Sequence, residues 1–127
     1  MIKRIDAVLL YTEDAKKLAD FYIEEVGLKM TMEGEMGEND EKLYGFEFGK
    51  DAGFYIMAHS KVKGKNKNPE RYMINFEVDD IDKEVGKLKK ASVKLIQDKY
   101  HFEGYGYIAT FEDIDGNYFQ LVQVKSN

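Results

Sequence analysis

One order of elements occurs twice in this chain, and that repeat limits the fold more than any single motif does. The first half opens with a strand pattern over Ile2–Leu10, followed by a helix whose apolar residues recur at helical spacing from Ala15 to Val26. Gly27 is expected to end this helix, because glycine tolerates the left-handed conformation that closes many helices. Three further strand patterns follow, at Leu28–Met32, Lys42–Phe48 and Gly53–His59.

The second half repeats this order after a polar connector, residues 61–70, which carries four lysines and the only proline. We expect the connector to be an exposed loop, although it could instead attract an anionic ligand or face the acidic segment 33–41 of another copy. After it, Tyr72–Val78 predicts a strand, and Asp79, Asp80 and Asp82 are typical signals for the start of a helix. Three final strand patterns follow, at Val93–Gln97, Tyr105–Glu112 and Tyr118–Val124.

We therefore expect an α+β fold made of two βαβββ modules, residues 1–60 and 71–127, within a single domain of residues 1–127. Each module would place its helix on one face of a small sheet. Two such sheets placed edge to edge would form a curved, incomplete barrel with a central cleft. The sequence leaves open whether the aromatic side of strand 42–48 faces this cleft or the core.

Composition excludes several classes of function. The chain has 24 acidic and 19 basic residues, a net charge of −5, which argues against nucleic-acid binding. No apolar run approaches the ~20 residues of a membrane helix, and the N-terminus lacks a signal-peptide pattern, so we expect a cytoplasmic protein. The absence of cysteine excludes disulfides, thiolate catalysis and cysteine-based zinc sites. Nine tyrosines, eight phenylalanines and six methionines could form an ordinary core or line a small-molecule pocket.

Two segments resemble a known superfamily. Ile5–Leu10, Asp14 and Phe21–Leu28 are similar to the opening of vicinal-oxygen-chelate proteins, which include glyoxalase I, bleomycin-resistance proteins and extradiol dioxygenases. Phe111–Leu121 is similar to their closing motif, with Ile114 where proline is usual. The resemblance covers essentially the whole chain and implies the two-module fold. Because members of this superfamily often pair, it also implies a homodimer.

The resemblance also identifies four positions that hold a divalent metal in the enzymes of the superfamily. Here they correspond to Ala7, to either Ile56 or Met57, to Met73, and to Gln120. Only Gln120 offers an oxygen donor, and one neutral donor is too few to hold such a metal. We therefore expect no metal at these positions, and no cofactor.

The expected function is the binding of a small, aromatic or amphipathic molecule in an apolar cup, as in glyoxalase/bleomycin-resistance-like proteins. The alternative is a metal-dependent, lactoylglutathione-lyase-like or related enzyme with a non-standard site. That site could use Glu77 or His59 as an acid or base, or a metal held by His59, His101 and either Glu77 or Glu103. A third possibility is that the cup binds no ligand and the protein serves as a dimeric interaction module. The candidate ligand-contacting residues are Ala7, Met57, His59, Met73, Asn75, Glu77, Tyr107, Tyr118 and Gln120.

Overall fold

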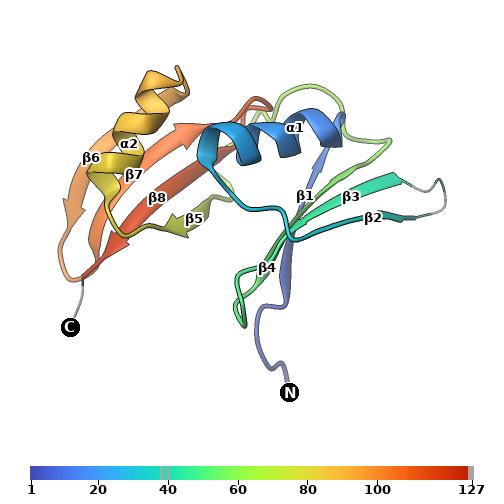
Figure 1. Ribbon diagram of the computed structural model, residues 1–127, viewed down its shortest axis with the longest axis horizontal. Helices are drawn as coiled ribbons and strands as arrows, with labels where there is room; N and C mark the ends of the chain where they lie inside the picture. The colour runs from blue at the N-terminus through green and yellow to red at the C-terminus, as the bar shows by residue number, and fades with distance from the viewer. Residues whose placement is uncertain (38, 40, 126–127) are drawn as a thin grey trace. The chain divides into compact units, whose positions relative to one another are not determined.

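The computed structural model describes residues 1–37, 39 and 41–125 (Figure 1). It divides the chain into two compact units, Met1–Gly64 and Lys65–Asn127. The boundary between the units lies inside the segment 61–70 that the sequence marks as a connector. Each unit is described below by itself, and the arrangement of the two modules around a central cleft stays a prediction.

The first unit contains one helix and a four-stranded mixed sheet (Figure 1). Strand β1 pairs in parallel with β4, while β3 pairs antiparallel with both β4 and β2, giving the order β1-β4-β3-β2. Helix α1 continues into a π-helical turn, η1. The elements are β1 (Ala7–Thr12), α1 (Ala15–Phe21), η1 (Tyr22–Val26), β2 (Met32–Met36), β3 (Glu41–Phe46) and β4 (Gly53–Ala58).

The second unit has the same order of elements and the same strand directions. Its sheet runs β5-β8-β7-β6, with β5 parallel to β8 and the other pairs antiparallel. The predicted repeat of strand, helix and three strands is therefore confirmed. The elements are β5 (Ile74–Glu77), α2 (Ile81–Lys90), β6 (Lys94–Phe102), β7 (Gly106–Glu112) and β8 (Tyr118–Val124).

Both helices begin with the same aspartate cap, so the two modules also share a hydrogen bond at corresponding positions. Asp14 Oδ1 accepts a hydrogen bond from the Lys17 amide at 3.1 Å, and Asp80 Oδ1 accepts one from the Lys83 amide at 3.2 Å. An aspartate at this position satisfies a backbone N–H that has no partner within the helix. Gly27 ends η1 with φ at +92°, as predicted.

The core of each unit lies between its helix and one face of its sheet. In the first unit, the buried Tyr22 ring packs edge-on against Phe54, and Phe54 stacks on Phe46 at 5.8 Å between ring centroids. In the second, Phe119 stacks on Phe111 at 6.0 Å. Tyr44 and Phe46 are 8% and 0% exposed, so the aromatic side of strand β3 belongs to the helix-covered core.

The first strand, expected over Ile2–Leu10, begins only at Ala7, and two further segments differ from the sequence-based expectation. The strand expected at Leu28–Met32 lies at Met32–Met36, so that all of it after Met32 belongs to the acidic segment 33–41, where no strand was expected. Likewise, β6 extends to Phe102, so His101 is in a strand and not in a loop. Both segments are polar strands at a sheet edge, where one side of the backbone needs no strand partner and apolar alternation is weak. Among the helices in the described part of the chain, none combines the length and apolar character that crossing a membrane requires.

Candidate functional site

The first sheet has a face opposite α1, here called face 1. Strand alternation and the cross-strand pairs define it, since residues paired across neighbouring strands point to the same side. Leu9 pairs with Tyr55, Tyr11 with Met57, and Met57 with Leu43. Within the strands, the apolar, aromatic and glycine residues of face 1 are Ala7, Leu9, Tyr11, Met32, Gly34, Met36, Leu43, Gly45, Gly53, Tyr55 and Met57. Face 1 is thus rich in rings and thioethers, as in the walls of small-molecule sites.

Tyr55 lies at the centre of face 1 in an unusual position. A Cβ atom added at Gly45 would lie 2.8 Å from Tyr55 Cε1, and one added at Gly53 would lie 2.7 Å from Tyr55 Cε2. Both distances are shorter than real Cβ contacts, so the ring occupies the space where side chains would otherwise stand. The ring therefore lies against the backbone of two strands.

His59 follows β4 directly. Because it comes two residues after Met57, alternation places it on the same side of the sheet as Met57. Its ring meets the Tyr11 ring edge-on, with 5.3 Å between centroids. Its Nδ1 accepts a hydrogen bond from the Lys61 amide at 3.0 Å, which fixes Nε2 as the nitrogen that carries the proton in the neutral ring. His59 therefore adds an N–H donor beside Tyr11.

The second sheet has a corresponding face opposite α2, here called face 2. Asn75 pairs with Gln120, and Gln120 with Thr110. Gln120 Nε2 donates to Thr110 Oγ1 at 2.8 Å, and an amide held in this way can still accept a hydrogen bond at Oε1. The residues of face 2 on its inner strands and on β5 are Asn75, Glu77, Ile108, Thr110, Glu112, Tyr118, Gln120, Val122 and Val124.

The turn before β8 positions Tyr118 and Gln120. Asp113 is 4% exposed, and its Oδ1 accepts hydrogen bonds from the backbone amides of Asp115 at 2.9 Å and Asn117 at 3.0 Å. Its Oδ2 accepts from Asn117 Nδ2 at 3.0 Å. Gly116 has φ at +81°, a conformation that favours glycine. One buried carboxylate therefore organises the turn from which β8 begins.

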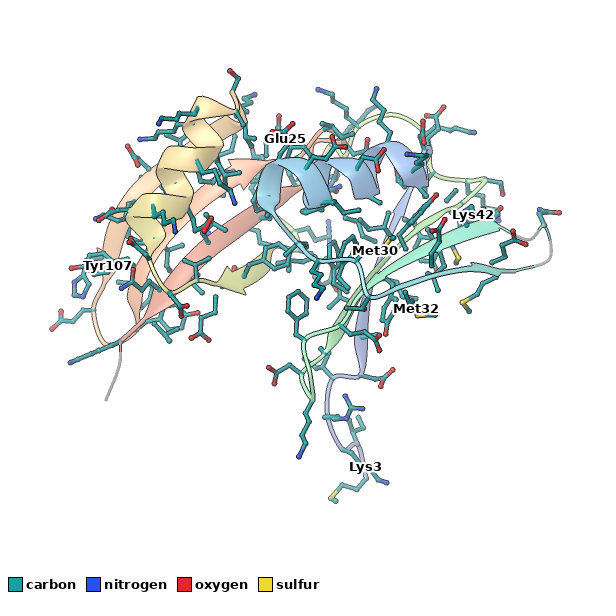
Figure 2. All side chains as sticks on the ribbon, in the orientation of Figure 1. Lys3, Glu25, Met30, Met32, Lys42 and Tyr107 are labelled. Carbon is teal, nitrogen blue, oxygen red and sulfur yellow. The ribbon has the colours of Figure 1, made fainter. Side chains whose placement is uncertain are left out.

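Tyr107 does not belong with the other candidate residues. It pairs with Gln123, whose side chain accepts from the Ile81 amide at the start of α2, so Tyr107 lies on the helix side of the second sheet. The Tyr107 ring, labelled in Figure 2, contacts the His101 ring, with 5.0 Å between centroids, and Lys99 Nζ, 5.0 Å from the ring centre. The same lysine forms a hydrogen bond with Asp82, which raises the pKa of Lys99. The alternation of side chains along β7 thus places Tyr107 on the opposite side of the second sheet from Asn75, Glu77, Tyr118 and Gln120.

The four family metal positions can now be placed on the two sheets. Of the two residues that could correspond to the second ligand, Ile56 is fully buried on the α1 side, whereas Met57 lies on face 1 with Ala7. Gln120 lies on face 2, and Met73, 39% exposed, directly precedes β5. Alanine offers no donor atom and methionine only a soft thioether, so these residues do not fit the family's divalent metal.

The alternative metal site is also not assembled. Within residues 1–37, 39 and 41–125, no group of three or more histidine, aspartate or glutamate side chains is placed to hold a metal ion. His101 pairs with Tyr107 on the α2 side of the second sheet, whereas Glu77 pairs with Val122 on face 2. These two candidate ligands therefore lie on opposite faces of one sheet.

Comparison with known proteins agrees with this architecture. Residues 4–121 match the model of the Glyoxalase/Bleomycin resistance protein/Dioxygenase superfamily. The chain is 31% identical to the uncharacterized protein YetH of Bacillus subtilis (strain 168), over 95% of this chain and 98% of that one. It is also similar to the structure of TnmS3, an antibiotic binding protein from Streptomyces sp. CB03234, with a TM-score of 0.74, 22% identity and 98% of each chain covered. The glyoxalase I of Leishmania major gives a TM-score of 0.75 at 21% identity, covering 96% of this chain and 87% of that one.

The family match spans nearly the whole chain, and the repeated βαβββ order is the fold that the resemblance implied. The chain therefore belongs to the Glyoxalase/Bleomycin resistance protein/Dioxygenase superfamily.

Proposed function

We propose that this protein binds a small aromatic or amphipathic molecule in an apolar site, without the metal of the superfamily's enzymes. The observation that carries the proposal is the replacement of metal donors by Ala7, Met57 and Met73. Such side chains suit the wall of an apolar site better than a coordination shell. TnmS3, which has the same fold, is described as an antibiotic binding protein, and this supports binding without catalysis.

Apolar and polar groups would contribute differently to binding. Face 1 is apolar, and burying its exposed apolar surface, including Leu9 at 53% exposure, would supply most of the affinity. In the first unit, His59 adds an N–H donor near face 1. In the second unit, taken by itself, face 2 offers the Asn75 amide beside the Gln120 amide. A few such groups would set the ligand's orientation.

The metal-free state is tested by elemental analysis of protein purified without chelator. We expect less than ~0.1 metal ion per chain, because only one of the four positions carries an oxygen donor. Stoichiometric zinc, nickel, manganese or iron would overturn this part of the proposal and favour the enzyme alternative.

Ligand binding is tested by thermal-shift screening against aromatic antibiotics and aromatic metabolites. A molecule present at 100 times its Kd stabilises the folded state by about 2.7 kcal/mol, which corresponds to a rise in Tm of about 10 °C for a chain of this size. We expect at least one molecule in the screen to raise Tm in this way. A screen in which no molecule raises Tm would contradict the proposal and favour an interaction module that binds no ligand.

The location of binding is tested with a matched pair of variants. Met57→Glu places a charge on face 1 and should weaken a hit at least tenfold, because the carboxylate would have to lose water on binding. Met30→Glu makes the same change at a 37% exposed position before β2 and should leave the affinity unchanged. Figure 2 labels Met30 and its neighbour Met32. Equal affinities for the two variants would contradict binding at face 1.

A further inference from the structure

Two glycines of face 1 are not explained by backbone conformation. Gly45 and Gly53 are both in strands, where glycine lowers stability, and neither has a positive φ. Any residue could therefore adopt their backbone geometry. At Gly53 the Tyr55 ring excludes a side chain, because an added Cβ would lie 2.7 Å from Cε2. At Gly45 an added Cβ would lie 2.8 Å from Tyr55 Cε1 and 2.7 Å from Met32 Cγ, so the ring and the flexible Met32 side chain share that space.

The two glycines hold the Tyr55 ring in a defined orientation. One edge of the ring lies over Gly45, its cross-strand partner on β3, and the other lies over Gly53, two residues earlier on β4. One π surface therefore faces the backbone, and the Tyr55 side chain, which is of intermediate burial, keeps part of its surface accessible. Strand β4 is an inner strand, so this flat surface lies in the interior of face 1, beside Leu9 of β1.

We propose that Tyr55 is the stacking platform for a planar ring system of the bound molecule. This inference rests on the proposed function and narrows it to ligands that contain a flat aromatic portion. Aromatic rings prefer offset stacking on one another, whereas a puckered saturated ring of the same size cannot match a flat surface. Leu9 and Met57 would then contact the edges of the stacked ring.

The experiment compares two probes of similar size and polarity, 2-naphthol and decahydro-2-naphthol, in NMR titrations of the full chain. Wild-type protein should bind both and prefer the planar probe. In Tyr55→Leu, which keeps apolar bulk, the preference should fall by roughly 2- to 12-fold, the range expected for one aromatic pair. Tyr55→Phe keeps the ring and should keep the preference.

Glycine variants test the orientation of the ring separately from its presence. Gly53→Ala should lift the ring from the sheet and reduce the preference, although Tyr55 is intact. Gly86→Ala is the matched control, because Gly86 is in helix α2, outside face 1, has no positive φ, and its added Cβ would meet no atom within 4 Å. Circular dichroism of each variant checks that the fold is retained.

The outcomes separate this inference from the proposed function. If both probes bind and Tyr55→Leu keeps the preference, the stacking platform is wrong while the proposed function stands. If neither probe binds wild-type protein at millimolar concentration, both fail. Self-association that Tyr55→Leu abolishes, seen by sedimentation, would show that a second copy occupies face 1 and would also overturn the platform.

Discussion

Replacing Asp113 with alanine should destabilise the protein strongly, because this buried carboxylate satisfies several donors at once. Its oxygens accept from the amides of Asp115 and Asn117 and from the Asn117 side chain. A hydrogen bond to a charged group contributes roughly 1.5–3 kcal/mol. The Asn117 side chain can turn to water, which leaves two backbone bonds and an expected loss of about 3 kcal/mol in the free energy of unfolding. Asp113→Asn keeps one carbonyl acceptor and should lose about half as much.

The assay is urea unfolding followed by far-UV circular dichroism. With a slope of about 1.5–3 kcal/mol per molar urea, a 3 kcal/mol loss lowers the unfolding midpoint by roughly 1–2 M. Asp51→Ala, an exposed aspartate in the turn before β4, is the control and should shift the midpoint by less than ~0.3 M. An Asp113→Ala variant that unfolds within ~0.5 M of the control would refute the view that one carboxylate holds this turn together.

Three further predictions concern the helix ends and an exposed carboxylate. Gly27→Ala should lose about 1 kcal/mol of stability by urea unfolding, because alanine is strained at φ +92°; an unchanged midpoint would contradict this. Asp80→Ala should lose about 1 kcal/mol by removing the α2 cap, and Asp14→Ala, its counterpart in α1, should match it. The Lys99 amide and the Lys89 side chain lower the pKa of Asp98 below its ordinary 3.8, so its contribution to stability is present above pH 3.8 and disappears as the pH falls further. Asp98→Asn should therefore reduce stability at pH 6 more than at pH 3, and equal losses at both would be inconsistent with the lowered pKa.

The repeat and most strand positions could be predicted because their signals are local. Strand β8 has the predicted bounds, Tyr118–Val124, since β-branched and aromatic residues follow directly on a turn that contains Gly116. Helix α2 likewise begins after an aspartate and keeps its apolar stripe. Simple alternation along β8 is also enough to put Gln120 and the buried Phe119 on opposite faces of the sheet.

Strand β2 was missed because its residues are depleted in strands. The segment Met32–Met36 reads Met-Glu-Gly-Glu-Met, which alternates with a period of two, but Glu and Gly weaken the strand signal. As an edge strand, β2 pairs only with β3, and the pairing is what stabilises it. The alternation of methionine and glutamate was the available clue.

Tyr55 was missed because its importance depends on register between strands. The sequence shows Gly53 two residues before Tyr55, but nothing local places Gly45 opposite the ring. The placement of Tyr107 has the same origin: the sequence offered it as a ligand-contacting residue, whereas its pairing with Gln123 assigns Tyr107 to the helix side of the second sheet. Contacts made across strands thus decide both cases.

The irregular strand β6 also affects how the protein behaves at high concentration. It is a nine-residue edge strand with exposed Tyr100 and Phe102, a combination that could template the addition of strands from other molecules. Its pairing with β7 shifts register on either side of Gln97, and Asp98 and Lys99 place charges within it. Such breaks and charges disfavour edge-to-edge aggregation. The residues that made β6 hard to predict from sequence are therefore the ones that should keep the folded protein from assembling into fibrils.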